Sequence, residues 1–287
     1  MLTMNTTTAN ATQEDSVEAA KFRINLLACL ADFSQMQGRY EEAESLLNQA
    51  LLLAEETCGG EALETSVILN NLAVLYKYLA RFGDAARLYR RSLRITKQAL
   101  GAQHTEVATL YHNLGGLEHA RERYRRGEPF ARRAVEIRER ALGPNHPDVA
   151  ADIAALAALL DGQGKYDEAE RLYKRALSIF EGTYGTGHYE IAINLNNLAA
   201  LYYAKGDWEQ SRELYQQALA IKEKLLGAHH PDVAMTLNNL AVLYKSQGDS
   251  EKARNLYKRA LDIFEGTFGA QHPKVITCRE NYACLNP

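Results

Sequence analysis

Apolar residues follow a helical spacing along almost the whole chain, and their pattern returns every 42 residues. Because residues three and four positions apart lie on one face of an α-helix, this spacing predicts amphipathic helices. The clearest copy has one such run before Gly248 and a second run after it, so each copy is expected to be a helical hairpin. The two runs are Leu237, Leu240, Ala241, Leu243 and Tyr244, then Ala253, Leu256, Tyr257, Ala260, Leu261, Ile263 and Phe264.

The period is constant. A marker leucine stands at Leu30, Leu72, Leu114, Leu156, Leu198 and Leu240, and Tyr282 takes its place in a truncated seventh copy. Small residues keep the same phase where the two helices of a hairpin would cross, at Ala43, Ala85, Gly127, Ala169, Ser211 and Ala253. A period of this length indicates stacked supersecondary units. The sequence therefore predicts an all-α solenoid of antiparallel helix pairs.

Turn residues mark the ends of the predicted helices. Pro147-Asp148 and Pro231-Asp232 suit the first turn of a helix, where a missing amide is harmless and a carboxylate meets the positive helix end. Each second helix is expected to end at a glycine that is followed three residues later by a histidine. These histidines are His104, His146, His188, His230 and His272. Stacked turns would hold them apart, so we expect them to cap helices and we assign no metal site.

The period also predicts how the chain is organised. Residues 1–21 are polar and aperiodic and are expected to be a disordered tail. Residues 22–273 are expected to form six repeats, and residues 274–287 a C-terminal capping helix. The six repeats are 22–63, 64–105, 106–147, 148–189, 190–231 and 232–273.

Composition and charge exclude several classes of function. The chain has 287 residues and a formal net charge of −3, and no stretch approaches the ~20 apolar residues of a membrane span. The N-terminus has no basic segment followed by a hydrophobic stretch, so we expect a cytoplasmic protein that binds neither nucleic acid nor a membrane. The four cysteines lack paired short spacings and are expected to be buried, reduced thiols.

The repeat resembles a known family. Its positions Leu237, Leu240, Ala241, Tyr244, Ala253, Tyr257 and Ala260 resemble the tetratricopeptide repeat, whose usual period is 34 residues. The longer period here, together with sequences such as Asn-Asn-Leu-Ala-Val-Leu-Tyr and His-His-Pro-Asp-Val-Ala, is similar to the cargo-binding repeats of kinesin light chains. Residues 1–21 lack sustained heptad spacing, so we expect a stand-alone, bacterial member of this repeat class. The resemblance implies a right-handed superhelix whose first helices line a concave, peptide-binding groove.

The resemblance also implies which residues face that groove. An asparagine pair precedes the marker leucine at Asn70-Asn71, Asn196-Asn197 and Asn238-Asn239, and Asn113 keeps its second member. A carboxamide offers both a donor and an acceptor, which suits contacts with the backbone of an extended ligand. Further along the same helices, the groove would continue through Lys77, His119, Asp161, Tyr203 and Lys245. The two lysines favour a ligand with acidic residues.

Two repeats depart from the pattern. Repeat four has Ala154 and Ala155 in place of the asparagine pair, which would form either an apolar pocket for a bulky ligand side chain or ordinary packing. Repeat three is rich in arginine, with a local excess of positive charge between Arg121 and Arg140. That excess would form either a patch for phosphate or an acidic partner, or a solvated face with ion pairs such as Glu136–Arg140.

No catalytic signature accompanies these features. The chain has no glycine-rich phosphate loop and no nucleophile elbow, and no cofactor is implied. The sequence therefore predicts a non-enzymatic adaptor that binds an extended segment of a partner protein along the asparagine-lined groove. Two alternatives remain open, a self-assembling structural repeat protein and a regulatory sensor of a short peptide or small molecule.

Overall fold

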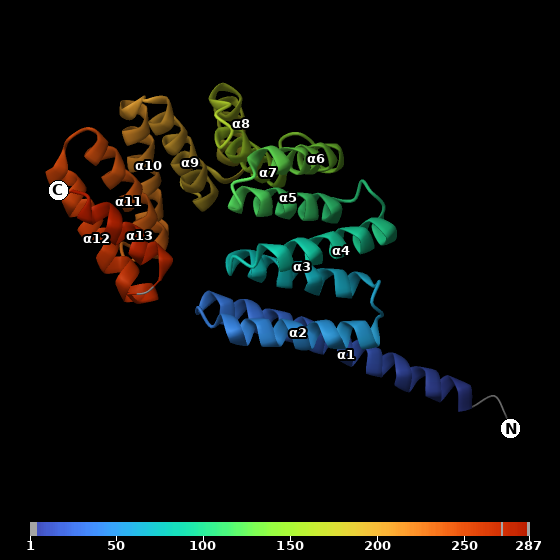
Figure 1. Ribbon diagram of the computed structural model, residues 1–287. Helices are drawn as coiled ribbons and strands as arrows, with labels where there is room; N and C mark the ends of the chain where they lie inside the picture. Colours follow the sequence, from blue (N-terminus) through green and yellow to red (C-terminus); the bar gives the residue numbers. More distant parts are fainter. Residues whose placement is uncertain (1–4, 271, 286–287) are drawn as a thin grey trace. The chain divides into compact units, whose positions relative to one another are not determined.

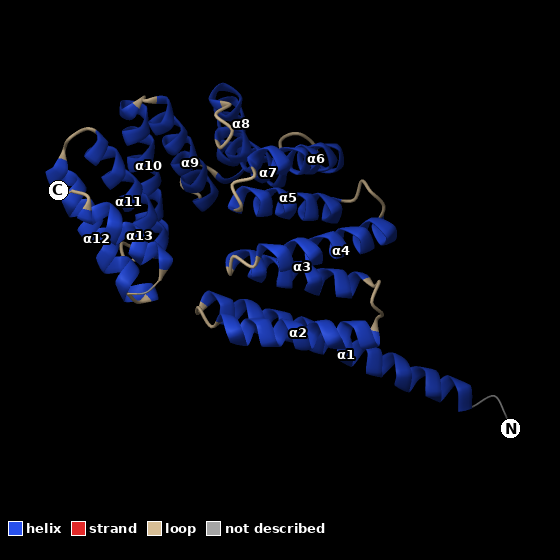
Figure 2. Cartoon of the chain, in the orientation of Figure 1, coloured by secondary structure: helices blue, strands red, loops and turns tan. Residues whose placement is uncertain are grey.

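A computed structural model describes residues 5–270 and 272–285 of the chain, with side chains from residue 17 onward. Over these residues the secondary structure is helical, without a strand (Figure 2). The predicted all-α fold is therefore confirmed. The helices are α1 (Asn5–Met36), α2 (Tyr40–Thr57), α3 (Leu63–Tyr78), α4 (Phe82–Leu100), α5 (Thr105–Ala120), α6 (Tyr124–Leu142), α7 (Pro147–Asp161), α8 (Tyr166–Tyr184), α9 (Tyr189–Lys205), α10 (Trp208–Leu226), α11 (Pro231–Ser246), α12 (Ser250–Phe268) and α13 (Pro273–Ala283).

The helices belong to two compact units, which meet in the sequence at Gly143 and Pro144. In the first unit, each helix from α1 to α6 packs against the next one, and α1, α3 and α5 also touch in succession (Figure 1). In the second unit, helices α7 to α13 pack in the same sequential way, and α7, α9 and α11 touch in succession. Each unit is thus a short stack of antiparallel helix pairs, as a solenoid requires.

The predicted histidine caps are present. The imidazole Nδ1 of His104, His146, His188, His230 and His272 accepts a hydrogen bond from the backbone N–H two residues later, at 3.1 to 3.3 Å. Each bond satisfies one of the amides that have no partner inside the first turn of a helix. The same histidine cap therefore stands at the N-terminus of α5, α7, α9, α11 and α13.

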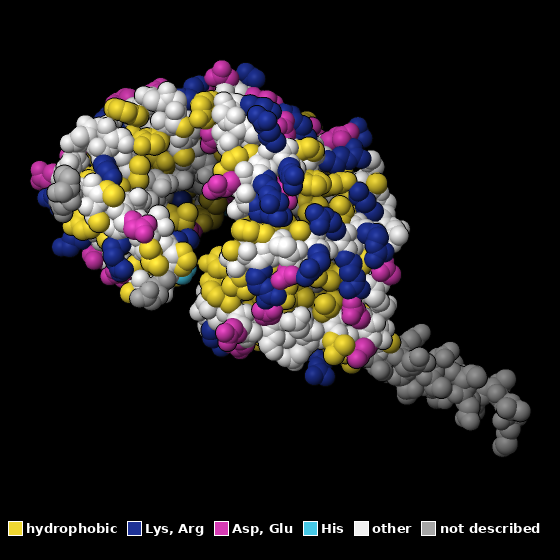
Figure 3. Space-filling model, viewed as in Figure 1, with side chains coloured by type: hydrophobic (Ala, Val, Ile, Leu, Met, Phe, Trp, Pro, Cys, Tyr) yellow, Lys and Arg dark blue, Asp and Glu magenta, His cyan; other side chains and the backbone are white. Residues whose placement is uncertain are grey.

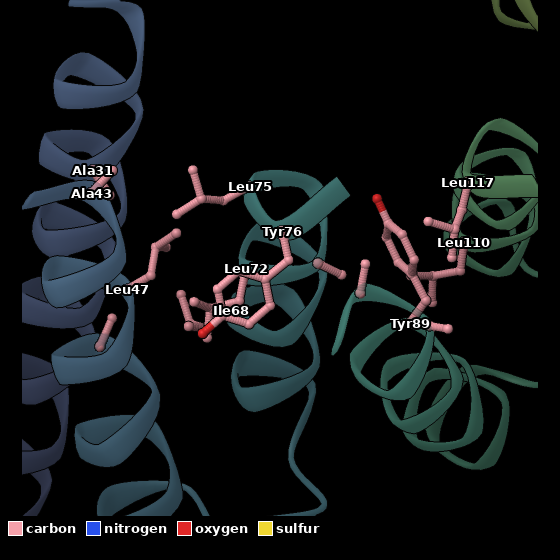
Figure 4. Packing of buried hydrophobic residues seen from close by; sticks show 14 of the residues in the cluster. Ala31, Ala43, Leu47, Ile68, Leu72, Leu75, Tyr76, Tyr89, Leu110 and Leu117 are labelled. Carbon is pink, nitrogen blue, oxygen red and sulfur yellow. The ribbon is translucent and has the colours of Figure 1, made fainter. Parts of the chain in front are cut away.

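The core of the first unit shows why small and aromatic residues alternate at fixed phase. Ala43 and Ala85 are 0% exposed where the helices of a pair cross, which allows the two backbones to approach closely. Tyr89 lies in the same cluster as Leu110 and Leu117 of the following pair, so its ring fills the space between neighbouring hairpins (Figure 4). No single hairpin could bury these side chains alone.

Two expectations need correction. Helix α1 begins at Asn5, so residues 5–21 are helical and not a disordered tail; residues 1–4 lie outside the described part. Extending a helix that is already anchored by packing costs little, because only nucleation is strongly unfavourable. The cysteines are free, but only Cys278 is buried, whereas Cys29 and Cys284 are exposed. An apolar sequence around a cysteine therefore does not ensure that its thiol is buried.

Replacing Ala80 by glycine is expected to raise the free energy of unfolding by about 1 kcal/mol. Ala80 has a positive φ of 57°, in the turn where Gly248 has a φ of 83° in another repeat. A Cβ atom is unfavourable in this left-handed conformation, and glycine relieves the cost. Denaturant unfolding followed by circular dichroism measures the change. The matched variant Gly248→Ala should lose a similar amount, and a stabilised Gly248→Ala would contradict the argument.

Candidate functional site

Asparagine side chains form hydrogen bonds between successive first helices, in the same way in both units. In the first unit, the Asn113 Nδ2 atom on α5 donates to the Asn70 Oδ1 atom on α3 at 2.8 Å. In the second unit, the Asn239 Nδ2 atom on α11 approaches the Asn196 Oδ1 atom on α9 at 3.5 Å. Each asparagine thus contacts the preceding repeat, 43 residues earlier in the sequence. We call Asn70, Asn113, Asn196 and Asn239 the asparagine ladder.

The other predicted asparagines lie beside the ladder. Asn71, Asn197 and Asn238 are half-buried, as are the ladder residues themselves. The Asn70 Nδ2 atom donates to the Asn71 Oδ1 atom at 3.4 Å. The Oδ1 atom of Asn238 is buried and has no hydrogen-bond partner within the described part of the chain. Within each unit, the predicted asparagines therefore lie together on the first helices of successive repeats.

The predicted groove residues nearly two turns further along are less uniform. Lys77 is half-buried, and burial lowers the pKa of its ammonium group. His119 is exposed on one side and meets Tyr124 edge-on at 5.3 Å between ring centroids. Partial burial of the imidazole lowers the pKa of His119, and the charge of Lys77 lowers it further. Tyr203 and Lys245 are half-buried, and the Tyr203 hydroxyl lies 2.8 Å from the Ser246 hydroxyl.

Each unit also contains a cavity beside its ladder, which the sequence reasoning missed. The first-unit cavity has a volume of about 220 Å³ between α3, α4 and α5. The second-unit cavity has a volume of about 270 Å³ between α11, α12 and α13. Val67 and Asn70 line the first, and their counterparts four repeats later, Met235 and Asn238, line the second. Equivalent positions of two repeats therefore line a cavity in each unit. The 42-residue period is the sequence signal that relates the two sets of lining residues.

The two cavities differ in chemistry. The floor of the first-unit cavity carries three buried hydroxyl groups, and the Ser66 Oγ atom lies 2.7 Å from both Ser92 Oγ and Thr96 Oγ1. The second-unit cavity has Phe264 where the first has Thr96, and Lys274 stands at its edge. The first cavity therefore combines an apolar wall with hydroxyl groups, whereas the second combines an apolar floor with one positive charge.

Lys222 occupies the corresponding position between α9, α10 and α11. Its side chain is buried, and its Nζ atom donates to the Thr236 Oγ1 atom at 3.0 Å. Thr236 in turn donates to the Asn196 Oδ1 atom at 3.3 Å. Burial lowers the pKa of the Lys222 ammonium group, although the nearby Asp232 opposes the shift. The Thr236 hydroxyl therefore connects Lys222 to Asn196 of the asparagine ladder.

The variant Lys222→Met is expected to be about 1–2 kcal/mol more stable than the wild type at pH 7, because it removes a buried charge while keeping the volume. A native pKa below the unfolded value means that the wild type gains stability as pH rises toward about 10.5. The difference between the two proteins should therefore shrink as the pH is raised from 7 toward about 10.5. Urea unfolding across this range measures it. The exposed control Lys258→Met should change stability by less than about 0.5 kcal/mol. A gap that stays constant with pH would contradict the role of the charge.

The arginine-rich third repeat forms ion pairs along its own helices. Arg132 pairs with Glu128 at 2.7 Å and Arg140 with Glu136 at 2.6 Å, both four residues apart on α6. Lysine and arginine side chains gather over α4 to α6 on the face that Figure 3 shows, with acidic side chains between them. Such pairs typically stabilise an exposed helix by about 0.2–0.5 kcal/mol each. The arrangement fits a solvated helix face.

No group of three or more His, Cys, Asp or Glu side chains is arranged to hold a metal ion within residues 5–270 and 272–285. In the same part of the chain, no helix is both long and apolar enough to cross a membrane.

Comparison with known proteins agrees with the repeat architecture. Residues 22–98, 106–182 and 190–266 match a family model described as tetratricopeptide repeat. None of the curated proteins matches the sequence. Among solved structures, BtubC (BKLC) from P. vanneervenii is 25% identical, with a TM-score of 0.60 over 91% of this chain and 94% of that chain. A putative kinesin light chain from Podosopora anserina with nearly identical repeats is 24% identical, with a TM-score of 0.55 over 70% and 95% of the two chains.

A third solved structure, NprR in complex with its cognate peptide NprX, shares the fold at 15% identity. Its TM-score is 0.66 over 92% of this chain and 71% of that chain. The matches to BtubC and to the Podosopora anserina protein confirm the predicted likeness to kinesin-light-chain-type repeats.

Proposed function

Since the chain belongs to the tetratricopeptide repeat family, a family of protein-interaction scaffolds, we propose that it binds an extended segment of a partner protein along the asparagine ladder of each unit. The ladder is the observation that carries this proposal. Asn113 and Asn239 are each held by a contact to the preceding repeat, so their side chains are already oriented before a ligand arrives. Preorganised groups bind more tightly because less ordering is needed on association.

The ladder still has hydrogen-bonding capacity for a ligand. Each carboxamide nitrogen has two hydrogens, and the contact to the preceding repeat uses one of them. Within the described part of the chain, the Oδ1 atoms of Asn113 and Asn239 accept no hydrogen bond. An extended peptide presents N–H and C=O groups at regular intervals, which suits such acceptors and donors whatever its sequence. Backbone recognition therefore supplies affinity, while the cavities and charged residues beside the ladder supply selectivity.

Two further features support an acidic ligand. Lys77 and Lys245 follow the ladder nearly two turns later, in the first and second unit respectively. The partly buried ammonium of Lys77 has a lowered pKa, so pairing with a ligand carboxylate would offset its desolvation. NprR, which shares this fold, has been solved with a bound peptide, and that precedent is consistent with a peptide as ligand.

The test is partner capture from a cell lysate on immobilised full-length chain. The ladder variant Asn113→Ala/Asn196→Ala/Asn239→Ala removes ladder carboxamides from both units while leaving the second helices intact. A matched control, Gln216→Ala/Gln217→Ala/Asn255→Ala, removes three exposed carboxamides from α10 and α12. We expect the control to retain a partner that the ladder variant loses, with equal helicity by circular dichroism. Equal capture by all three proteins would show that the ladder does not bind the partner.

A further inference from the structure

Helix α1 exposes an unusually large amount of apolar surface. The exposed fractions are Phe22 71%, Leu26 47%, Leu30 43%, Phe33 53% and Met36 87%. Cys29, in the middle of this series, is also exposed. The opposite face of α1 packs into the first unit, where Ile24 and Ala31 are 2% and 1% exposed. A helix that is apolar on both faces is normally covered on both faces.

The position of α1 at the end of the stack explains only part of this surface. Leu26, Leu30 and Phe33 have the same repeat phase as Ile68, Leu72 and Leu75 of α3, which are at most 1% exposed. On α3 the corresponding face packs against α2 of the preceding pair (Figure 1), whereas α1 is the first helix of the described chain. This part of the surface is the uncovered end of a repeat stack.

The rest of the surface is particular to α1. Phe22 stands where the later repeats have a charged residue: Glu64, Glu106, Asp148, Glu190, Asp232 and Lys274. Cys29 stands where four later repeats have the second asparagine of the groove pair. These residues extend the apolar surface beyond the area that a preceding hairpin would cover. Helix α1 therefore exposes apolar residues that a preceding repeat would not cover. We call this exposed apolar face of α1 the seam.

The seam has the spacing of a two-helix coiled coil. Its exposed residues are Ala19, Phe22, Leu26, Cys29, Phe33 and Met36, which alternate by three and four residues. Such a heptad spacing keeps a narrow apolar seam facing one other helix. Glu18 and Arg23 flank the seam five residues apart, and in a parallel pair of identical helices these two positions meet across the interface with opposite charge.

We propose that a second copy of this chain covers the seam, with α1 of one copy parallel to α1 of the other. The identical heptad seams then pack against each other, Glu18 of each copy meets Arg23 of the other, and the two Cys29 side chains face each other across the two-fold axis. The interface uses no residue of the asparagine ladder, so the proposed peptide site stays open in the dimer.

Sedimentation equilibrium of the full chain tests the proposal. We expect a dimer for the wild type and, for Leu26→Glu/Phe33→Glu, a dissociation constant at least ~100-fold higher, because two apolar contacts become buried carboxylates. Equal circular dichroism shows that the variant is folded. The matched control Leu225→Glu/Ile276→Glu, which changes two exposed apolar residues of the second unit, should remain dimeric. A wild type that is monomeric at ~100 µM, a concentration that populates even weak dimers, or a dimer that the seam variant leaves intact, overturns the proposal.

Orientation is tested in the Cys284→Ser chain, where Cys29 is the exposed cysteine that remains. Mild oxidation should then give a disulfide-linked dimer that Cys29→Ser abolishes. Arg23→Glu should weaken the dimer, and Glu18→Arg/Arg23→Glu should restore it, because the swapped charges attract again in a parallel pair. Failure of the double variant to restore it overturns the parallel arrangement. A monomeric wild type that co-sediments with phosphatidylcholine/phosphatidylserine vesicles through the seam overturns the dimer in favour of a membrane surface.

Discussion

Replacing Tyr89 by alanine is expected to lower the free energy of unfolding by about 3–5 kcal/mol, the usual cost of deleting a buried aromatic ring. Tyr89 is 0% exposed and packs in one cluster with Leu110, Leu114 and Leu117 of the following pair. Figure 4 shows its ring between α4 and α5. The cavity left by alanine would separate two neighbouring hairpins, and in a solenoid that interface is a main source of stability.

The variant Tyr89→Phe separates the ring from the hydroxyl group. The Tyr89 hydroxyl is buried without a hydrogen-bond partner in the described part of the chain, and burial raises the pKa of its phenol. Removing an unsatisfied buried polar group recovers its desolvation cost, so we expect a gain of about 1 kcal/mol. Urea unfolding followed at 222 nm measures both variants. A phenylalanine variant that is clearly less stable than the wild type would mean that the hydroxyl is hydrogen-bonded.

Much of the fold follows from local sequence signals that act within one or two turns. Apolar residues at helical spacing predict each helix, and the glycine before each capping histidine predicts where one helix ends and the next begins. His230 illustrates the point, because its Nδ1 atom bonds to the Asp232 amide at 3.1 Å, two residues away. A cap of this kind depends on neighbours in the sequence and not on the rest of the fold. Repetition at a fixed period then extends the same argument along the chain.

The candidate site depends on contacts between repeats, which the sequence does not display directly. The groove asparagines follow from the resemblance, but the contact between Asn113 and Asn70 depends on how closely α5 approaches α3. The cavities depend in the same way on side chains from three helices, such as Val67, Thr96 and Thr109. Helix α1 shows the same dependence, because the marker Leu30 keeps the phase of Leu72 and Leu114 but is 43% exposed, whereas those two are 1% and 4% exposed. Periodicity predicts which face of a helix is apolar, but whether that face is buried depends on the neighbouring helices.

The two cavities lead to the second large expected effect, which rests on the proposed peptide site. Val67 and Met235 occupy the same repeat position at the rims of the two cavities and are 55% and 38% exposed. Tryptophan at either position can fill the cavity at little cost to stability, because each original side chain lies partly in water at the cavity rim. A ligand side chain buried in such a cavity contributes about 1.5–3 kcal/mol. Val67→Trp and Met235→Trp are therefore each expected to weaken binding of the captured partner at least ~10-fold.

Titration calorimetry with the captured partner segment measures the two variants and their combination. If the segment reaches both cavities, the losses should add to about 100-fold or more, because the two sites are far apart in the sequence and share no lining residue. A loss confined to one variant would assign the segment to one unit. The control Leu225→Trp enlarges an exposed side chain of α10 away from either cavity and should bind like the wild type. Unchanged affinity in the double variant would mean that the ligand follows the asparagine ladder without entering the cavities, and that selectivity resides in the charged positions Lys77 and Lys245.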